Sequence, residues 1–197
     1  MAKKHAPSIE LPSVTEIEAS TDTQQVGAES MNFVAANSKV FVPKVYDHFV
    51  DPEKKKRYII MAHIPGTNLQ RLSTSLTSVE KKVISKRIRE ALDEIRNIPS
   101  QGYLGNLNRT PYFEGIFYSP EHDPAISGPF ESEGQLNEGL LKCLSQRESP
   151  HYVRLLRGPI IERTLKGHRT VFTHVDLQRK SAIVFGTTAV RIQDHLD

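Results

Sequence analysis

The chain has 197 residues, of which 38% are hydrophobic and 25% charged, a composition typical of a soluble globular domain rather than a disordered chain. Its formal net charge of +3 is small and indicates no nucleic-acid partner, and its single cysteine, Cys143, excludes an intramolecular disulfide and a Cys-rich zinc site. No apolar run approaches the roughly 20 residues of a transmembrane helix, so we expect a cytoplasmic protein without a membrane partner.

The first third of the chain predicts an irregular segment followed by a short helix and a β-hairpin. Residues 1–25 are polar, contain two prolines and lack a sustained hydrophobic period, so we expect them to be poorly ordered. Apolar residues at helical spacing predict a helix over about residues 28–37. The runs FVPKVYDHFV and RYIIM, joined by the turn DPEKKK, predict the hairpin. The Pro-Gly pair in IPGTNL interrupts this pattern and predicts a hinge near residues 62–68.

Capping signals mark two helices in the middle of the chain. Thr77 and Glu80 form a T-x-x-E capping box, after which an apolar stripe runs until Pro99. The stripe consists of Val79, Val83, Ile84, Ile88, Leu92 and Ile95. Residues 100–131 are rich in turn formers and predict a long loop that is either functional or ordered by docking on the rest of the domain. Ser132 and Gln135 form a second capping box that opens another helix, and a third helix is predicted over about residues 150–156.

The stretch HVDLQRKS, from His174 to Ser181, is the main candidate for a functional site. It lies between the β-like runs TVF and AIVF, and a further run, AVRIQD, ends on Asp194. In a kinase-type site one Asp orients and deprotonates the attacking hydroxyl, while a second Asp holds Mg²⁺ on the nucleotide phosphates. Asp176 and Asp194 are the candidates for these two roles. The His-x-Asp spacing is common by chance, so the prediction depends on its setting between strands.

Seven segments between Glu29 and Asp194 follow a familiar order: ESMNFVAAN, VPKVYDHFVD, RYIIM, IPGTNL, IREALDEIRNIPSQGYLGN, ISGPFESE and VFTHVDLQRK. Together they resemble the aminoglycoside phosphotransferase/choline kinase-like family, and its fungal members most closely. The resemblance implies an α+β, protein-kinase-like two-lobed fold. It also implies transfer of the γ-phosphoryl group of ATP, with Mg²⁺, to the hydroxyl of a small-molecule acceptor.

The resemblance also assigns roles within the candidate loop. His174 and Asp176 match the catalytic loop of the family, with Asp176 accepting or orienting the proton of the acceptor hydroxyl. Asp194 matches the metal-binding Asp at the end of the following strand, and Ser181 stands where a second metal ligand, usually Asn, is found. Val175 replaces the glycine of the family's His-Gly-Asp triplet. A β-branched residue resists backbone conformations that only glycine adopts freely.

The nucleotide side of the resemblance involves Glu29, Met61 and His63. Glu29 matches the helix glutamate that pairs with a nucleotide-holding lysine, whereas Met61 and His63 belong to the segment against which adenine would rest. Before Glu29 the sequence shows neither a Gly-rich loop nor a Lys-bearing strand, and only three residues follow Asp194. We therefore expect a partial kinase-like domain over residues 26–197, with an incomplete N-lobe and a truncated C-lobe.

Three hypotheses follow for the function. The first is a small-molecule phosphotransferase that uses ATP and Mg²⁺, whose activity is impaired or lost because phosphoryl transfer depends on positioning and charge stabilisation. The second is a non-catalytic, pseudokinase-like binding module or a fragment of a longer enzyme. The third is a basic nucleic-acid or anion-binding protein, against which the sequence shows positive charges scattered among acids.

Overall fold

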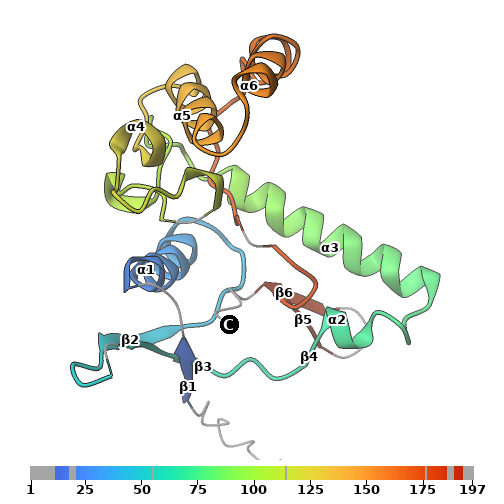
Figure 1. Cartoon of the computed structure of the whole chain (residues 1–197). Coiled ribbons are helices and arrows are strands. Elements are labelled where there is room, and N and C mark those ends of the chain that lie inside the picture. Colours follow the sequence, from blue (N-terminus) through green and yellow to red (C-terminus); the bar gives the residue numbers. More distant parts are fainter. Residues whose placement is uncertain are drawn as a thin grey trace, which may run out of the picture. The chain divides into compact units, whose positions relative to one another are not determined.

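The computed structural model has a mixed α+β fold, as predicted (Figure 1). It describes residues 12–17, 21–54, 56–113, 115–175, 177–185 and 189–192. The chain forms two compact units: unit 1 is drawn from residues 1–95 and 174–197, and unit 2 is drawn from residues 96–173. The predicted hinge near residues 62–68 lies inside unit 1 and stays a prediction. None of the described helices is long and apolar enough to cross a membrane.

Unit 1 contains a three-stranded antiparallel sheet that packs against a helix. The strands are β1 (Pro12–Ile17), β2 (Val45–Val50) and β3 (Arg57–Ala62), in the order β1-β3-β2. Strands β2 and β3 form the predicted hairpin. The helix α1 (Thr21–Asn37) contacts β2 and β3. Its residues Ala28 and Met31 form a buried cluster with Ile59 and Met61 of β3, because the apolar face of the helix meets the apolar face of the sheet.

The structure differs from the expectation that residues 1–25 are poorly ordered. This segment contains strand β1 and the first residues of α1, which begins at Thr21 rather than near Ala28. Strand β1 pairs with β3 along its whole length, from Pro12 opposite Ala62 to Ile17 opposite Arg57. A partner distant in sequence thus supplies backbone hydrogen bonds that the local pattern does not announce. Residues 1–11 and 18–20 lie outside the described part of the chain.

A second antiparallel sheet in unit 1 includes the strand that directly follows Ser181, the last residue of the candidate loop. Its strands are β4 (Thr67–Asn68), β5 (Ala182–Phe185) and β6 (Ala189–Ile192), with β5 in the centre. The predicted strand in AIVF is therefore confirmed, and that in AVRIQD is confirmed over Ala189–Ile192. The prediction of a strand in TVF, residues 170–172, was wrong, since these residues form no strand. Both edges of β5 are already occupied by β4 and β6, so a strand here would have no place beside β5.

The short helix α2 (Leu69–Leu72) and the long helix α3 (Ser78–Arg96) complete the described elements of unit 1. The capping box of α3 is confirmed: Glu80 Oε2 accepts from the Thr77 N–H at 2.8 Å, and Thr77 Oγ1 accepts from the Glu80 N–H at 3.3 Å. Ile84 and Ile95 are buried as the apolar stripe predicts. Val79 is an exception, with 71% of its surface exposed, because it lies away from the buried face of the helix.

Unit 2 is helical. Its elements are the helices α4 (Pro124–Ser127), α5 (Glu133–Ser145) and α6 (Pro150–Leu156), a π-helical turn η3 (Arg157–Glu162), and the short 3-10 turns η1 (Leu107–Arg109) and η2 (Gly115–Phe117). The helices predicted after Ser132 and over residues 150–156 are confirmed. The N–H of Gln135 donates to Ser132 Oγ at 3.3 Å, whereas Gln135 Oε1 accepts from the N–H of Glu131 rather than from that of Ser132.

The predicted loop over residues 100–131 is ordered by its own aromatic side chains. Tyr112 stacks on Phe117 with ring centroids 5.2 Å apart, and Phe130 lies 5.9 Å from Phe117. Phe130 also packs against Gly139 of α5, where an added Cβ would lie 2.7 Å from the ring. This aromatic cluster supplies the apolar contacts that a loop of this length needs in order to hold one conformation.

Candidate functional site

The candidate loop His174–Ser181 ends in a turn that Ser181 closes. The Ser181 N–H donates to the carbonyl oxygen of Gln178 at 3.1 Å, and the N–H of Gln178 donates to Ser181 Oγ at 3.3 Å. The Ser181 side chain is fully buried, with 0% of its surface exposed. The side chain proposed from the resemblance as a metal ligand therefore takes part in the shape of the loop. Asp176 lies outside the described residues.

Two neighbouring segments of unit 1 anchor this loop. The N–H of Gln70, in α2, donates to the carbonyl oxygen of Arg179 at 3.2 Å, and Thr67 of β4 pairs with Val184 of β5. Gly66 permits this approach: a Cβ there would lie 2.7 Å from both Ile183 Cγ2 and the carbonyl oxygen of Val184. The glycine of the Pro-Gly motif, a motif that predicted a hinge, thus allows β4 to pack directly against the strand that follows the loop.

His174 and Val175, at the start of the loop, have different environments. His174 is half-buried, and its ring atom Nε2 is shielded from solvent. Val175 is 87% exposed. Its φ is not among the positive values of the described non-glycine residues, so Val175 is accommodated here without a left-handed backbone. The expected conflict between a β-branched residue and a glycine-like conformation does not arise.

The residues predicted to contact the nucleotide lie at three different places in unit 1: on α1, in β3 and just after β3. Glu29 lies on α1 between Ala28 and the buried Met31, and it is partly exposed. Met61 is only 1% exposed and belongs to the buried cluster of α1 and β3. His63 follows β3 and is exposed. Met61 is thus a core residue, and the adenine contact assigned to it and to His63 stays a prediction.

The metal site implied by the resemblance involves Asp194, which lies outside the described residues. Within the described part of the chain, no three His, Cys, Asp or Glu side chains form a group that could hold a metal ion. The two predicted acids, Asp176 and Asp194, therefore remain predictions for catalysis and for Mg²⁺ binding.

Unit 2 contains polar contacts that sequence reasoning did not predict. His168 Nδ1 lies 2.5 Å from Glu133 Oε1, and the hydrogen bond from the His168 ring lowers the pKa of the Glu133 carboxyl. Nearby, Asn137 Nδ2 donates to the carbonyl oxygen of Leu165 at 2.6 Å. These contacts join the segment after η3 to α5. Their sequence separations of 28 and 35 residues explain why no local spacing revealed them.

Two further ion pairs join elements of unit 2. Arg157 donates to both carboxylate oxygens of Glu138, at 2.6 and 2.9 Å, and this hydrogen bonding lowers the pKa of Glu138. Lys142 Nζ donates to Asp123 Oδ2 at 2.6 Å, which is the main cause of the lowered pKa of Asp123. The bidentate arginine contact fixes the start of η3 against α5 with a defined geometry.

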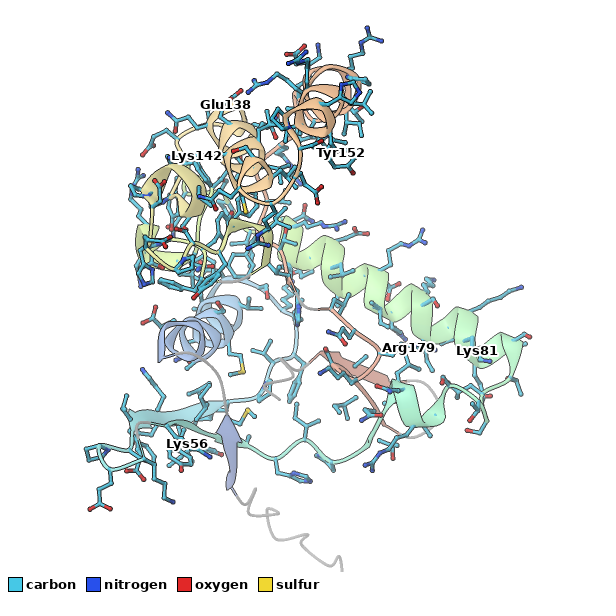
Figure 2. All side chains as sticks on the ribbon, viewed as in Figure 1. Lys56, Lys81, Glu138, Lys142, Tyr152 and Arg179 are labelled. Carbon is cyan, nitrogen blue, oxygen red and sulfur yellow. The ribbon has the colours of Figure 1, made fainter. Side chains whose placement is uncertain are left out.

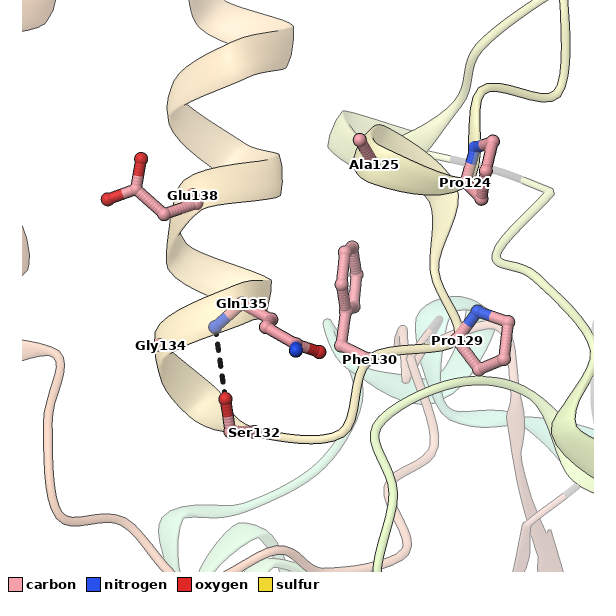
Figure 3. A pocket seen from close by; sticks show the side chains of 8 residues that line it. All are labelled: Pro124, Ala125, Pro129, Phe130, Ser132, Gly134, Gln135 and Glu138. Carbon is pink, nitrogen blue, oxygen red and sulfur yellow. Dashed lines mark hydrogen bonds between the residues drawn. The ribbon is translucent and has the colours of Figure 1, made fainter.

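An open pocket of about 540 Å³ lies beside the N-terminal turns of α5 (Figure 3). One part of its lining consists of Pro124, Ala125, Pro129 and Phe130, and the other of Ser132, Gly134, Gln135 and Glu138. Its volume falls in the range of small-molecule sites. Figure 3 shows that the hydrogen bond between Ser132 and Gln135 at this pocket is the helix cap itself. None of the residues predicted for the kinase-type site lines it.

Comparison with known proteins does not identify the chain. No protein-family model matches it, and no curated protein matches it. The likeness to the aminoglycoside phosphotransferase/choline kinase-like family therefore rests on the sequence segments quoted for it.

Proposed function

We propose that the chain is a non-catalytic, pseudokinase-like member of the aminoglycoside phosphotransferase/choline kinase-like family. In this proposal it keeps the kinase-type order of elements without an effective phosphate clamp. The alternative is a phosphotransferase that still moves the γ-phosphoryl group of ATP to a small-molecule hydroxyl.

Strand β1 is the observation that carries the proposal. In protein kinases a lysine on a strand pairs with a glutamate on the helix called αC and contacts the nucleotide phosphates. Here β1 precedes α1, and α1 contains Glu29, the glutamate matched by the resemblance. The sequence of β1 is PSVTEI, which contains no lysine. The arrangement of strand and helix supports the kinase-like assignment, whereas the missing lysine favours loss of catalysis.

Ser181 gives a second argument in the same direction. The kinase catalytic loop holds one Mg²⁺ through an Asn at this position. A serine hydroxyl is a weaker ligand than an amide carbonyl oxygen, and the Ser181 hydroxyl already accepts a hydrogen bond from the Gln178 N–H within a buried turn. Metal binding would then depend on Asp194 with fewer supporting ligands.

The alternative is favoured by the anchoring of the candidate loop. Pairing of β4 with β5 and the hydrogen bond between Gln70 and Arg179 hold the C-terminal end of the loop that carries Asp176 in sequence. A general base needs such positioning. In this case ATP and Mg²⁺ are the cofactors, Asp176 is the base, and Asp194 binds the metal.

Nucleotide turnover distinguishes the two. We expect the purified chain with Mg-ATP to release ADP no faster than its Asp176→Asn variant, with water, amino alcohols or aminoglycosides as acceptors. Thermal unfolding with and without Mg-ATP, for the wild type and Asp194→Ala, reports binding separately from turnover. Acceptor-dependent ADP release that disappears in Asp176→Asn would overturn the proposal and establish the phosphotransferase.

A further inference from the structure

Helix α3 has an exposed basic face. Lys82, Lys86 and Arg89 are spaced at i, i+4 and i+7, which places them on one side of the helix, and all three are exposed. The buried residues Ile84 and Ile95 lie on the opposite side. Figure 2 shows Lys81, in the first turn of α3, extending from the ribbon. The sequence suggested scattered charges, whereas the helix gathers these three onto one face.

Two of the three charges of this basic face have no ion-pair partner within the described part of the chain. Lys82 and Arg89 form no ion pair there. Lys86 forms an exposed ion pair with Glu90, with Nζ 3.9 Å from Oε1, and an exposed pair of this kind contributes little. Like charges three or four residues apart repel one another on a helix. An anionic partner on this face would relieve that repulsion.

The order of charges along α3 restricts the kind of partner. Asp93 and then Arg96 continue the same face, four and seven residues after Arg89. The face therefore reads as three positive charges, one negative charge and a further positive charge. A long polyanion or an anionic lipid surface that followed the helix would meet Asp93. A second copy of α3, packed antiparallel, would pair Lys82 with Asp93 but would oppose Lys86 to Arg89. A short acidic segment fits the pattern better than any of these.

We propose that the basic face of α3 (Lys82, Lys86 and Arg89) binds a short acidic helical segment of a partner protein. A partner helix has the same rise of about 1.5 Å per residue. Carboxylates separated by four and three residues on it would therefore face the three cations in register. A basic residue one turn further would face Asp93. The exposed Val79, three residues before Lys82, offers an apolar contact at the basic end.

The probe is a fluorescein-labelled, alanine-rich helical peptide with Glu at i, i+4 and i+7 and Lys at i+11, offered in both chain directions. Fluorescence anisotropy measures its Kd at low ionic strength, where exposed charge pairs are least screened. We expect the K82E/K86E/R89E variant to bind about tenfold more weakly or worse. The R147E/R163E/K166E variant has the same change in net charge at other exposed positions and should bind within about twofold of the wild type.

Circular dichroism verifies that both variants stay folded, as expected for substitutions at exposed positions. Equal losses in the two variants would overturn the proposal in favour of net charge alone. Equal binding of a scrambled peptide with the same composition would show that the spacing of the carboxylates does not matter and would overturn the proposed match to the three cations. Tighter binding of an oligonucleotide or of anionic vesicles with the same charge would replace the acidic segment by another partner class. The absence of peptide binding to the wild type would also refute the proposed docking of an acidic segment on α3.

Discussion

Gly66→Ala tests whether β4 and the strand after the candidate loop pack as closely as the structure indicates. Gly66 has a φ of +143°, and an added Cβ would lie 2.7 Å from Ile183 Cγ2 and from the carbonyl oxygen of Val184. The side chain of Ile183 can rotate, but the backbone oxygen can move only if β5 moves. The substitution should therefore separate β4 from β5 and loosen the anchoring of the loop.

Two effects add at this position. Holding a non-glycine residue in a sparsely populated φ region costs about 1–3 kcal/mol, and overpacking costs a similar amount. A central expectation of about 3 kcal/mol corresponds to a melting temperature lower by about 6–12 °C for a chain of this length. A melting temperature reports on the whole chain, so hydrogen exchange of the β4 and β5 amides, followed by mass spectrometry, gives the local measurement.

Alanine substitutions at two other glycines distinguish the cost of backbone strain from the cost of a steric clash. Gly102 has a φ of +83° with no atom near an added Cβ, so Gly102→Ala should show the backbone cost alone. Gly158 has neither a positive φ nor a close neighbour, so Gly158→Ala should be neutral within about 0.5 kcal/mol. Protection of β5 amides that is as high in Gly66→Ala as in the wild type would refute the close packing of β4 on β5.

Met61→Ala should destabilise unit 1 by about 2–5 kcal/mol in urea unfolding, because Met61 of β3 is buried in a cluster with residues of α1. Val79→Ala should change the stability by less than about 0.5 kcal/mol, and a large loss there would contradict the exposure of Val79. Glu133→Gln should reduce the loss of unit 2 stability in acid. The pKa of Glu133 is lowered below its usual 4.5 by the hydrogen bond from His168, so its stabilisation is complete above 4.5 and disappears as the pH falls through the lowered value. Equal acid unfolding curves for the variant and the wild type would refute this contribution.

The elements of the fold were predictable where a sequence pattern, such as a capping box or a hairpin turn, agreed with the contacts that the segment makes in the structure. The capping box of Thr77 and Glu80 fixed the start of α3, and the hairpin of β2 and β3 followed from two β-forming runs around a turn. Strand β1 was missed because its pairing with β3 crosses about 45 residues, and nothing in PSVTEI announces that partner. Val79 was misplaced because the apolar stripe was read by residue type, while its angular position lies off the buried face.

The candidate site was predictable as a motif but not as an arrangement of contacts. The sequence identifies HVDLQRKS through its position between two β-like runs, of which only AIVF forms a strand, and it does not reveal that Ser181 is buried in the turn. The contact of Glu133 with His168 joins residues 35 positions apart and leaves no periodic trace. A signal did exist at Gly66, since a glycine beside a proline often marks a close approach, but the identity of the approaching strand required the structure.

The contacts that shape the candidate loop are distinct from the groups that would perform its chemistry. The turn is held by Ser181 and Gln178, and its neighbour Arg179 is held by Gln70 through backbone atoms. Strand β5 is held by β4 and β6 through backbone pairing. These interactions need neither a nucleotide nor a metal ion. Under the proposed non-catalytic function, selection for the fold alone would preserve the shape of this loop even without a phosphate clamp. A kinase-like motif and the proposed function would then be compatible in one chain.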